Sequence, residues 1–394
     1  MQRRAAVRVG LALACAGVLG VSVLLSGAAR ADIRIGVTVS VTGPQASLGL
    51  PEKNAVTLLP REIGGERIET IVLDDASDTT RAVTNTRKLM SESNVDLIIG
   101  SSTTPNTLAM IDVAAEGRTP VISLASSVRL IEPMDARRRW IFKTPHSDSH
   151  MASLIVEHAA AHGVKTLAYI GFANALGEAF LTEVQRFAEL RHIRVSATER
   201  YVPTDASVTA QVLHLLATRP DAVVIGASGT PAALPARALA ERGYAGKIYF
   251  NHGVSNNAFV RLCGRDCEGA YVPTGPVMVA AQLPDANPAK KQALDFARRY
   301  EAAFGRHTVS LFAAYAGDIG LLLQRAVPVA LKRARPGTPG FRAALRDALE
   351  NVRGLPTTTG VVNMSAQDHV GLDQHARVMA QIRHGEWRFA DTAR

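Results

Sequence analysis

Four small hydroxyl residues, Ser101 to Thr104, follow directly after the apolar stretch 97–100. Such a run could supply a nucleophile, cradle a phosphate or hold a small ligand by hydrogen bonds. Thr104 suits a helix N-cap, and Pro105 would then stand at the first helical position, where its missing N–H costs nothing. The hydroxyl and N–H groups of residues 102–104 would face a crevice at the positive end of a helix, which favours a carboxylate. Capping alone accounts for Thr104 taken singly.

A second loop repeats this chemistry after the apolar stretch 120–123. Ala125, Ser126 and Ser127 offer backbone N–H groups and hydroxyls without bulk. In open parallel sheets the ligand crevice lies beyond the carboxyl ends of the strands, so loops that follow the strands are the informative ones. The two loops therefore predict a wall that holds an anion by hydrogen bonds.

Catalytic interpretations of these hydroxyls have less support. Ser228 lies in GASGT, but the position two residues later is Thr230, so the G-x-S-x-G pattern of a nucleophile elbow is absent. No histidine and aspartate partners are indicated for Ser102 or Ser228, which leaves an exported serine hydrolase as a remote alternative. Neither a G-x-x-x-x-G-K-[ST] loop nor a G-x-G-x-x-G sequence after a strand occurs. We expect no enzyme activity and no cofactor.

Two other clusters contain residue types that bind metals. His158 and His162 lie four apart on one face of an expected helix, but no acidic residue or third histidine is indicated as a partner. Asp74, Asp75 and Asp78 lack the ordered alternation of a calcium loop, and turn formation or helix capping explains them better. We expect no metal site.

The rest of the sequence predicts the elements that would position these loops. Short β-rich runs alternate with helical stretches, which indicates an α/β fold of parallel sheets with helices on both faces. The first set has strands at 33–39, 67–73, 95–99 and 120–123, with helices near 51–59, ending at 89, and at 106–116. The second set has strands at 166–170, 194–200, 222–225 and 247–250, with helices at 151–162, 206–217 and ending at 190 and 242. Three helical segments and a strand-like tail follow from residue 289.

The N-terminal 31 residues predict a secretory signal peptide. Three arginines precede the apolar stretch 9–25, and Ala29 and Ala31 frame an A-x-A cleavage site after Ala31. An uncleaved anchor is the lesser alternative, because the apolar core contains several glycines. Removal takes away four arginines and no acid, which lowers the formal net charge from +9 to +5. The basic residues are dispersed, so we expect a soluble periplasmic protein with no nucleic-acid partner.

Two cysteines remain after removal of the signal peptide. Cys263 and Cys267 stand in CGRDC, a polar stretch of an exported chain, and predict a short-loop disulfide. A metal site would need further thiols, and a redox motif would favour C-x-x-C.

Several segments, in their order and spacing, resemble one known family. They include VLDDASDTTRAVTNTRKLM at 72–90, VDLIIGSSTTPNTLAM at 95–110, IFKTPHSDSHMA at 141–152 and DAVVIGASGTPAALPARAL at 221–239. Over essentially the whole mature chain, the sequence resembles the type I periplasmic solute-binding proteins. The specific resemblance is to the branched-chain amino acid (leucine/isoleucine/valine) receptor family of ABC importers.

The resemblance implies two α/β lobes, joined by three hinge crossings, that close around one small ligand. The first lobe would comprise residues 32–146 and 276–357, and the second residues 147–275 and 358–394. It also implies a monomer whose partners are the membrane permease subunits of an ABC importer. A ligand-sensing receptor subunit with the same fold is the alternative function.

The resemblance also implies roles for individual residues. In family members that bind amino acids, first-lobe hydroxyl and N–H groups hold the ligand carboxylate. The corresponding positions here are Thr103, Thr104, Ala125 and Ser127, with Ser102 and Ser126 adjacent, and Leu48 matches a position that lines the pocket. From the second lobe we expect contacts from Phe172, Leu176, Ser228, Gly229 and His252.

Departures from the family pattern bear on the ligand. Leu176 and Gly229 stand where aromatic residues often lie, which would enlarge the pocket. His252 stands where an acid typically receives the ligand's ammonium group, and burying an ammonium without an anionic partner is unfavourable. Asp148, at the first hinge crossing, matches a second acidic position and could still serve. We expect a small carboxylate and favour an aromatic or other organic acid over a branched-chain amino acid.

Overall fold

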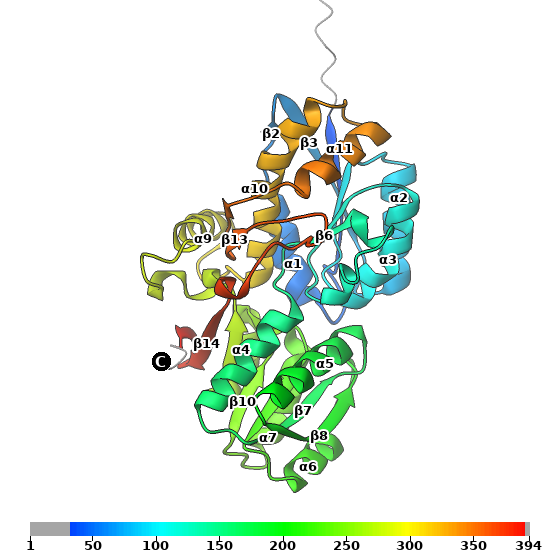
Figure 1. Cartoon of the computed structure of the whole chain (residues 1–394). Helices are drawn as coiled ribbons and strands as arrows, with labels where there is room; N and C mark the ends of the chain where they lie inside the picture. The colour runs from blue at the N-terminus through cyan, green and yellow to red at the C-terminus, as the bar shows by residue number, and fades with distance from the viewer. Residues whose placement is uncertain (1–31, 391–394) are drawn as a thin grey trace, which may run out of the picture.

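A computed structural model describes residues 32–390 of the 394-residue chain. These residues form two lobes, each built on one sheet flanked by helices (Figure 1). The expected signal peptide, with its cleavage after Ala31, lies outside the described residues, as do residues 391–394. The predicted α/β class and two-lobed architecture are confirmed.

The first lobe, the upper one in Figure 1, contains a six-stranded sheet in the order β2-β3-β1-β4-β5-β6. Its strands are β1 (Ile33–Val39), β2 (Glu62–Ile63), β3 (Glu66–Asp74), β4 (Leu97–Gly100), β5 (Val121–Ser123) and β6 (Ile141–Lys143). The pairs are parallel except for the short β2 against β3. β4 and β5 are buried at every position, as expected for apolar strands covered on both faces.

The helices of this lobe are α1 (Ala46–Val56), α2 (Thr79–Ser91), α3 (Thr104–Glu116), α9 (Lys290–Phe304), α10 (Leu311–Leu331) and α11 (Pro339–Leu349). α1 packs along α10, and α2 packs along α3. The helix predicted near 51–59 begins earlier, at Ala46, so Pro51 lies inside α1. Leu48 and Ala55, seven residues apart on α1, are both buried. Their packing offsets the loss of the backbone hydrogen bond that Pro51 cannot donate.

The second lobe contains a seven-stranded sheet in the order β15-β14-β11-β10-β9-β7-β8. Its strands are β7 (Thr166–Phe172), β8 (Arg194–Tyr201), β9 (Ala222–Gly226), β10 (Lys247–Phe250), β11 (Tyr271–Thr274), β14 (Val378–Arg383) and β15 (Glu386–Phe389). Its helices are α4 (Asp148–Ala161), α5 (Ala175–Leu190), α6 (Thr209–Ala217), α7 (Ala233–Ala240) and α8 (Asn257–Cys263). The predicted strand-like tail forms β14 and β15, which are antiparallel to their neighbours.

The chain passes between the lobes three times: between β6 and α4, after β11, and before β14. The third passage comes later than the expected boundary at residues 357 and 358. After β12 (Leu355–Pro356) and β13 (Val361–Val362), four further side chains join the apolar core of the first lobe: Met364, Val370, Leu372 and Ala376. By its contacts, the segment up to Ala376 therefore belongs to the first lobe, because its apolar side chains are buried in that core.

One histidine ties the three passages together. His146 is fully buried, and its Nε2–H donates to the carbonyl oxygens of Ala376 (2.8 Å) and Thr359 (3.2 Å), while Nδ1 accepts from the Tyr315 hydroxyl (3.1 Å). Gly275, in the second passage, lies so close that a Cβ there would stand 3.1 Å from His146 Cε1. Burial lowers the pKa of His146 to about 3, so a neutral imidazole holds the hinge.

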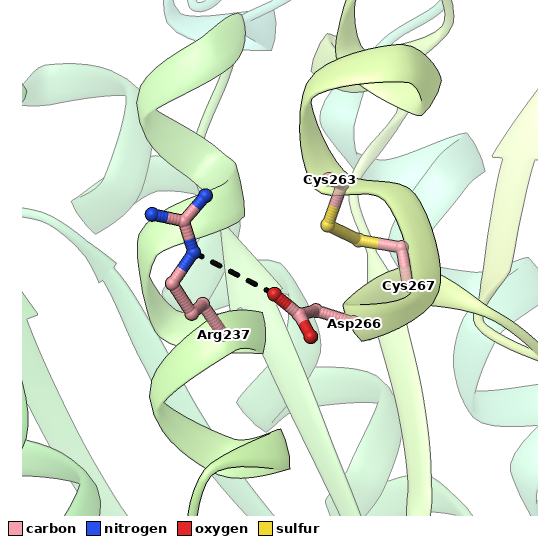
Figure 2. The surroundings of a disulfide bond; sticks show 4 residues. All are labelled: Arg237, Cys263, Asp266 and Cys267. Atoms are coloured by element: carbon pink, nitrogen blue, oxygen red, sulfur yellow. Dashed lines mark ion pairs between the residues drawn. A yellow bond between two sulfur atoms is a disulfide. The ribbon is translucent and has the colours of Figure 1, made fainter.

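The predicted disulfide joins the end of α8 to the short 3-10 turn that follows it. Cys263 and Cys267 are both buried and are bonded, with their Cα atoms 5.6 Å apart (Figure 2). Asp266 of the same turn lies 3.5 Å from Arg237 Nε of α7. That ion pair is exposed and therefore adds little to stability. The disulfide is the stronger restraint on the turn.

Replacing both cysteines by alanine should lower the free energy of unfolding by ~2 kcal/mol, because the closed loop is short and the entropy it removes from the unfolded chain is small. Ligand affinity should stay the same, since neither cysteine lines the cavity described below. Urea unfolding and calorimetry of the Cys263→Ala, Cys267→Ala double variant measure the two quantities. An unchanged free energy of unfolding would contradict a structural role for this bond.

Candidate ligand-binding site

A cavity lies between the lobes, at the carboxyl ends of β4, β5, β9 and β10. The space between its lining atoms is about 380 Å³, part of which is open to solvent. Its lining combines hydroxyl, amide and apolar side chains: Leu48, Ser102, Thr103, Thr104, Leu124, Ala125, Ser126, Pro145, Leu176, Ser228, Asn251, His252, Gly253, Phe312 and Tyr315. Nine of these were expected from the sequence, so the two hydroxyl loops do converge on one crevice.

The first-lobe wall is built around the start of α3. Thr103 is the N-cap, one residue earlier than predicted, and Thr104 is already helical. The Thr104 side chain is therefore not used for capping, and its Oγ1 is buried without a hydrogen-bond partner in the described residues. An unpaired buried hydroxyl is unfavourable, so this atom is available to a group that enters the cavity. The capping explanation of Thr104 was wrong because the helix begins one residue sooner.

Ser102 has a buried network behind it. Its Oγ accepts a hydrogen bond from the Ser40 N–H (3.0 Å) and contacts Glu52 Oε2 of α1. Glu52 is fully buried, and its burial, together with the nearby charge of Asp75, raises its pKa well above the ordinary value. Asp75 is buried too but accepts from Ser40 Oγ (2.7 Å) and the Ser77 N–H (3.0 Å). A fully buried carboxyl group, whose burial favours its neutral form, therefore lies directly behind the wall.

The second-lobe wall carries two further unpartnered polar atoms. Asn251 Oδ1 accepts from the Gly253 N–H (2.9 Å), but Asn251 Nδ2 and His252 Nδ1 have no hydrogen-bond partner among the described residues. Burial, the largest cause, lowers the pKa of His252 well below its ordinary value, and the charge of Lys143 acts in the same direction. His252 is therefore a neutral imidazole. Asn251 was not predicted as a site residue. It follows β10 as Ser228 follows β9, so its position after a strand could have identified it as one.

Asp148 lies behind the cavity instead of lining it. Its Oδ1 accepts from Ser126 Oγ (2.9 Å), and burial raises its pKa to about 6, against the lowering effect of Lys143. Lys143 donates from Nζ to the carbonyl oxygens of Ser126 and Pro145 (both 2.8 Å), and burial lowers its pKa to about 8. Ser126 thus stands between the acid and the cavity. None of the described lining residues is acidic.

Three other expected residues also lie outside the lining. Ser127 accepts from the Arg129 N–H (3.3 Å) at the start of a 3-10 turn, so its side chain serves the loop. Phe172 packs edge-on against Tyr201, with ring centroids 5.1 Å apart. Gly229 has a φ of 66° and faces α1, where a Cβ would stand 3.0 Å from Ser47 Oγ. The absence of a side chain at Gly229 lets the lobes approach each other, in contrast to the expected enlargement of the pocket.

A hydrogen-bonded pair joins the lobes at the edge of the cavity. Ser228 Oγ donates to Gln45 Oε1 (2.6 Å), and Gln45 Nε2 donates to the Ser228 carbonyl oxygen (3.4 Å). Gln45 and Ser228 also line a second, neighbouring cavity. Phe172 and Asn174 line this second cavity, and Thr103, Leu176 and Ser228 line both. Gln45 was missed because no local pattern distinguishes it from other loop residues.

The two clusters considered for metals have packing and turn-forming roles. His158 Nδ1 hydrogen-bonds with the Tyr249 hydroxyl (2.9 Å), and its ring stacks on His162 at 4.0 Å. Asp78 accepts from the Arg81 N–H (2.8 Å) as the N-cap of α2, and Asp74 accepts from the Val41 N–H (2.9 Å). The predicted capping and turn functions of these aspartates are confirmed.

Comparison with known proteins identifies the family. The family model for periplasmic binding proteins matches residues 32–386. The chain belongs to the periplasmic binding proteins. An extracellular ligand-binding receptor from Rhodopseudomonas palustris HaA2 is 43% identical, with a TM-score of 0.89, covering 92% of this chain and all of that one. The Leu/Ile/Val-binding protein homolog 3 of Brucella melitensis is 22% identical over 345 residues, 86% of this chain and 88% of its own.

A third relative is similar in fold. The solute-binding protein of an ABC transporter from Rhodopseudomonas palustris BisB5, solved in complex with 3,4-dihydroxybenzoic acid, is 20% identical, with a TM-score of 0.76 over 90% of this chain and 95% of that one. Together these matches confirm a type I periplasmic binding protein of the branched-chain amino acid receptor family. They do not support an exported serine hydrolase.

The family places this periplasmic binding protein outside the cytoplasm. Among residues 32–390, no helix combines the length and apolar character needed to cross a membrane. The family assignment agrees with the expected export of the chain.

Proposed function

We propose that this periplasmic binding protein is the solute-binding component of an ABC importer and captures a small carboxylic acid between its lobes. The carboxylate would bind at the first-lobe wall, where Ser102, Thr103, Thr104 and Ala125 offer hydroxyl and N–H groups. The hinge would close the second lobe over the ligand, and the closed form would be presented to the membrane permease subunits. Closure requires that the ligand bind the closed form more tightly than the open one.

The observation that carries this proposal is the polarity of the lining. Three buried polar atoms of the lining have no partner in the part of the chain that the structure describes: Thr104 Oγ1, Asn251 Nδ2 and neutral His252 Nδ1. All three can donate a hydrogen bond to a ligand. Within residues 32–390, no acidic side chain lines the cavity, so a ligand ammonium group would be buried without an anionic partner. This supports a carboxylic acid that lacks an amino group.

The apolar part of the lining supports an aromatic or other organic acid. Leu48, Leu124 and Leu176 provide an apolar boundary, and the rings of Phe312 and Tyr315 provide another. The two named relatives at 20–22% identity bind different classes of ligand according to their names, so they support both an aromatic acid and a branched-chain amino acid. The preference for an aromatic acid rests on the cavity.

Thermal unfolding of the mature protein with a ligand panel tests the proposal. The panel comprises benzoate, phenylacetate, leucine, isoleucine and valine, with benzamide as the neutral counterpart of benzoate. At about 100 times the dissociation constant, a bound ligand adds ~2.7 kcal/mol and should raise the unfolding temperature by roughly 3–5 °C. We expect the aromatic carboxylates to do so and benzamide to have little effect. Stabilisation by the amino acids alone would overturn the preference for an organic acid.

A further inference from the structure

The buried acid behind the first-lobe wall has no role in the site as described so far. Glu52 lies on α1 with no exposed surface, its Oε2 contacts Ser102 Oγ, and its Oε1 has no hydrogen-bond partner among the described residues. A buried carboxylate with one oxygen unpaired is strongly unfavourable, whereas a neutral carboxyl group needs fewer partners. The geometry therefore favours the neutral acid independently of the raised pKa of Glu52.

The protonation state of Glu52 decides which way the Ser102 hydroxyl points. If Glu52 were ionised, Ser102 would donate its hydrogen to Oε2 and could offer only lone pairs to the cavity. An ionised Glu52 would also place a negative charge directly behind the wall that is expected to bind an anion. If Glu52 is neutral, its O–H can donate to Ser102 Oγ, which also accepts from the Ser40 N–H at 3.0 Å.

We propose that Glu52 is a proton-carrying positioning residue: its O–H donates to Ser102 Oγ, so that the Ser102 hydrogen is directed into the cavity toward the ligand carboxylate. Ser102 then accepts two hydrogen bonds from the protein and has its single hydrogen free for the ligand. Ser102 is 3% exposed and lines the cavity, so the hydrogen has a short path to a bound anion. This inference rests on the proposed binding of a carboxylate.

The nearby acid Asp75 has a different environment. Its carboxylate accepts hydrogen bonds from Ser40 Oγ, Ser101 Oγ and the Ser77 N–H. Three donors therefore satisfy the Asp75 oxygens, while Glu52 has one hydroxyl contact and one oxygen without a partner among the described residues. Of these two buried acids, Glu52, the one with fewer hydrogen-bond donors, lies beside the cavity wall.

Two variants of Glu52 test the direction of this hydrogen bond. Glu52→Gln retains a donor of similar length, and Glu52→Met retains the length without a donor. Affinities are measured by calorimetry with benzoate, phenylacetate, leucine and isoleucine, and the tightest binder of the wild type is the probe. We expect Glu52→Met to weaken binding about tenfold and Glu52→Gln to stay within about threefold of the wild type. Tighter binding by Glu52→Met would show that Glu52 is an anion and would overturn the proposal.

Two further measurements separate positioning from general structural support. The effect of Glu52→Met should disappear in a Ser102→Ala background, because Ser102 transmits it. A full additional tenfold loss in that background would contradict the inference. Infrared difference spectra of wild type and Glu52→Gln should show the carbonyl band of a protonated carboxyl group in the wild type only. Its absence would overturn the inference even if Glu52→Met fails to fold.

Failure of the proposed function gives a different result. If the wild type binds none of the carboxylates, the infrared band still tests whether Glu52 is protonated, while the binding role of the wall is lost. If the wild type binds a carboxylate and both variants bind it as tightly, carboxylate capture stands and the role of Glu52 is contradicted.

Discussion

Replacing Thr104 by valine should weaken binding of the carboxylate ligand about 10- to 100-fold, the range expected for one hydrogen bond to a charged group. The free energy of unfolding of the unliganded protein should be unchanged or slightly higher. Valine has nearly the shape of threonine, and the Thr104 hydroxyl has no partner in the described residues, so its removal breaks no hydrogen bond within the protein. Calorimetric titration measures the first effect, and urea unfolding measures the second.

Thr107→Val, on the same helix, is the matched control. Thr107 is also fully buried, but its Oγ1 accepts from the Ser101 N–H (3.1 Å) and hydrogen-bonds with Ser123 Oγ (3.0 Å), and it does not line the cavity. This variant should lose about 1–3 kcal/mol of unfolding free energy, because it leaves buried polar groups unpaired. Ligand affinity should change much less than in Thr104→Val. Equal affinities for Thr104→Val and the wild type would exclude Thr104 from the binding site.

The second large effect that we expect is a loss of folding stability at low pH, caused by protonation of His146. His146 has an ordinary pKa of 6.5 in the unfolded chain and about 3 in the native hinge. Between these values the unfolded state binds more protons, so this histidine's contribution to stability is complete above pH 6.5 and falls as the pH drops toward 3. The loss is ~1.4 kcal/mol per pH unit, or roughly 3 kcal/mol between pH 6.5 and 4.5. The charged imidazolium cannot accept the Tyr315 hydroxyl hydrogen at Nδ1.

A comparison of variants isolates this contribution, because Asp148 and Asp318, whose pKa values are both raised by burial to about 6, act in the opposite direction in the same pH range. His146→Gln removes the titrating group, so the stability difference between wild type and variant should shrink by ~1.4 kcal/mol per unit below pH 6.5. Urea unfolding at pH 7, 6 and 5 measures it. A constant difference between wild type and His146→Gln would contradict the buried, neutral state of His146.

Thr104 and His146 differ in how well their roles could be predicted from the sequence. Thr104 was expected in the site from its place between a strand and a proline-led helix, although its capping role was assigned one residue too late. His146 was visible only as part of the hinge motif IFKTPHSDSHMA. Its bonds to Thr359 and Ala376 join residues more than 200 positions apart, and no local pattern records such a pairing.

The residues that line the cavity also fall into two groups, those that the sequence predicted and those that it did not. Residues of the strand-ending loops, such as Thr103, Ala125 and Ser228, do line the cavity, because parallel strands bring their carboxyl ends to one edge. Phe312 and Tyr315 were missed because they belong to a helix of apolar residues whose inner face is indistinguishable from ordinary core packing.

By itself the sequence determined the alternation of strands and helices, the two sets of α/β units, the hydroxyl loops and the spacing of the disulfide. These features depend on side-chain periodicity and turn chemistry over a few residues. Tertiary structure decided which loops face each other, that Gln45 and Ser228 join the lobes, and that Glu52 lies neutral behind Ser102. It also decided that the segment up to Ala376 packs on the first lobe. These outcomes depend on burial and on contacts between distant segments, which fix partners, protonation and orientation only when the lobes are assembled.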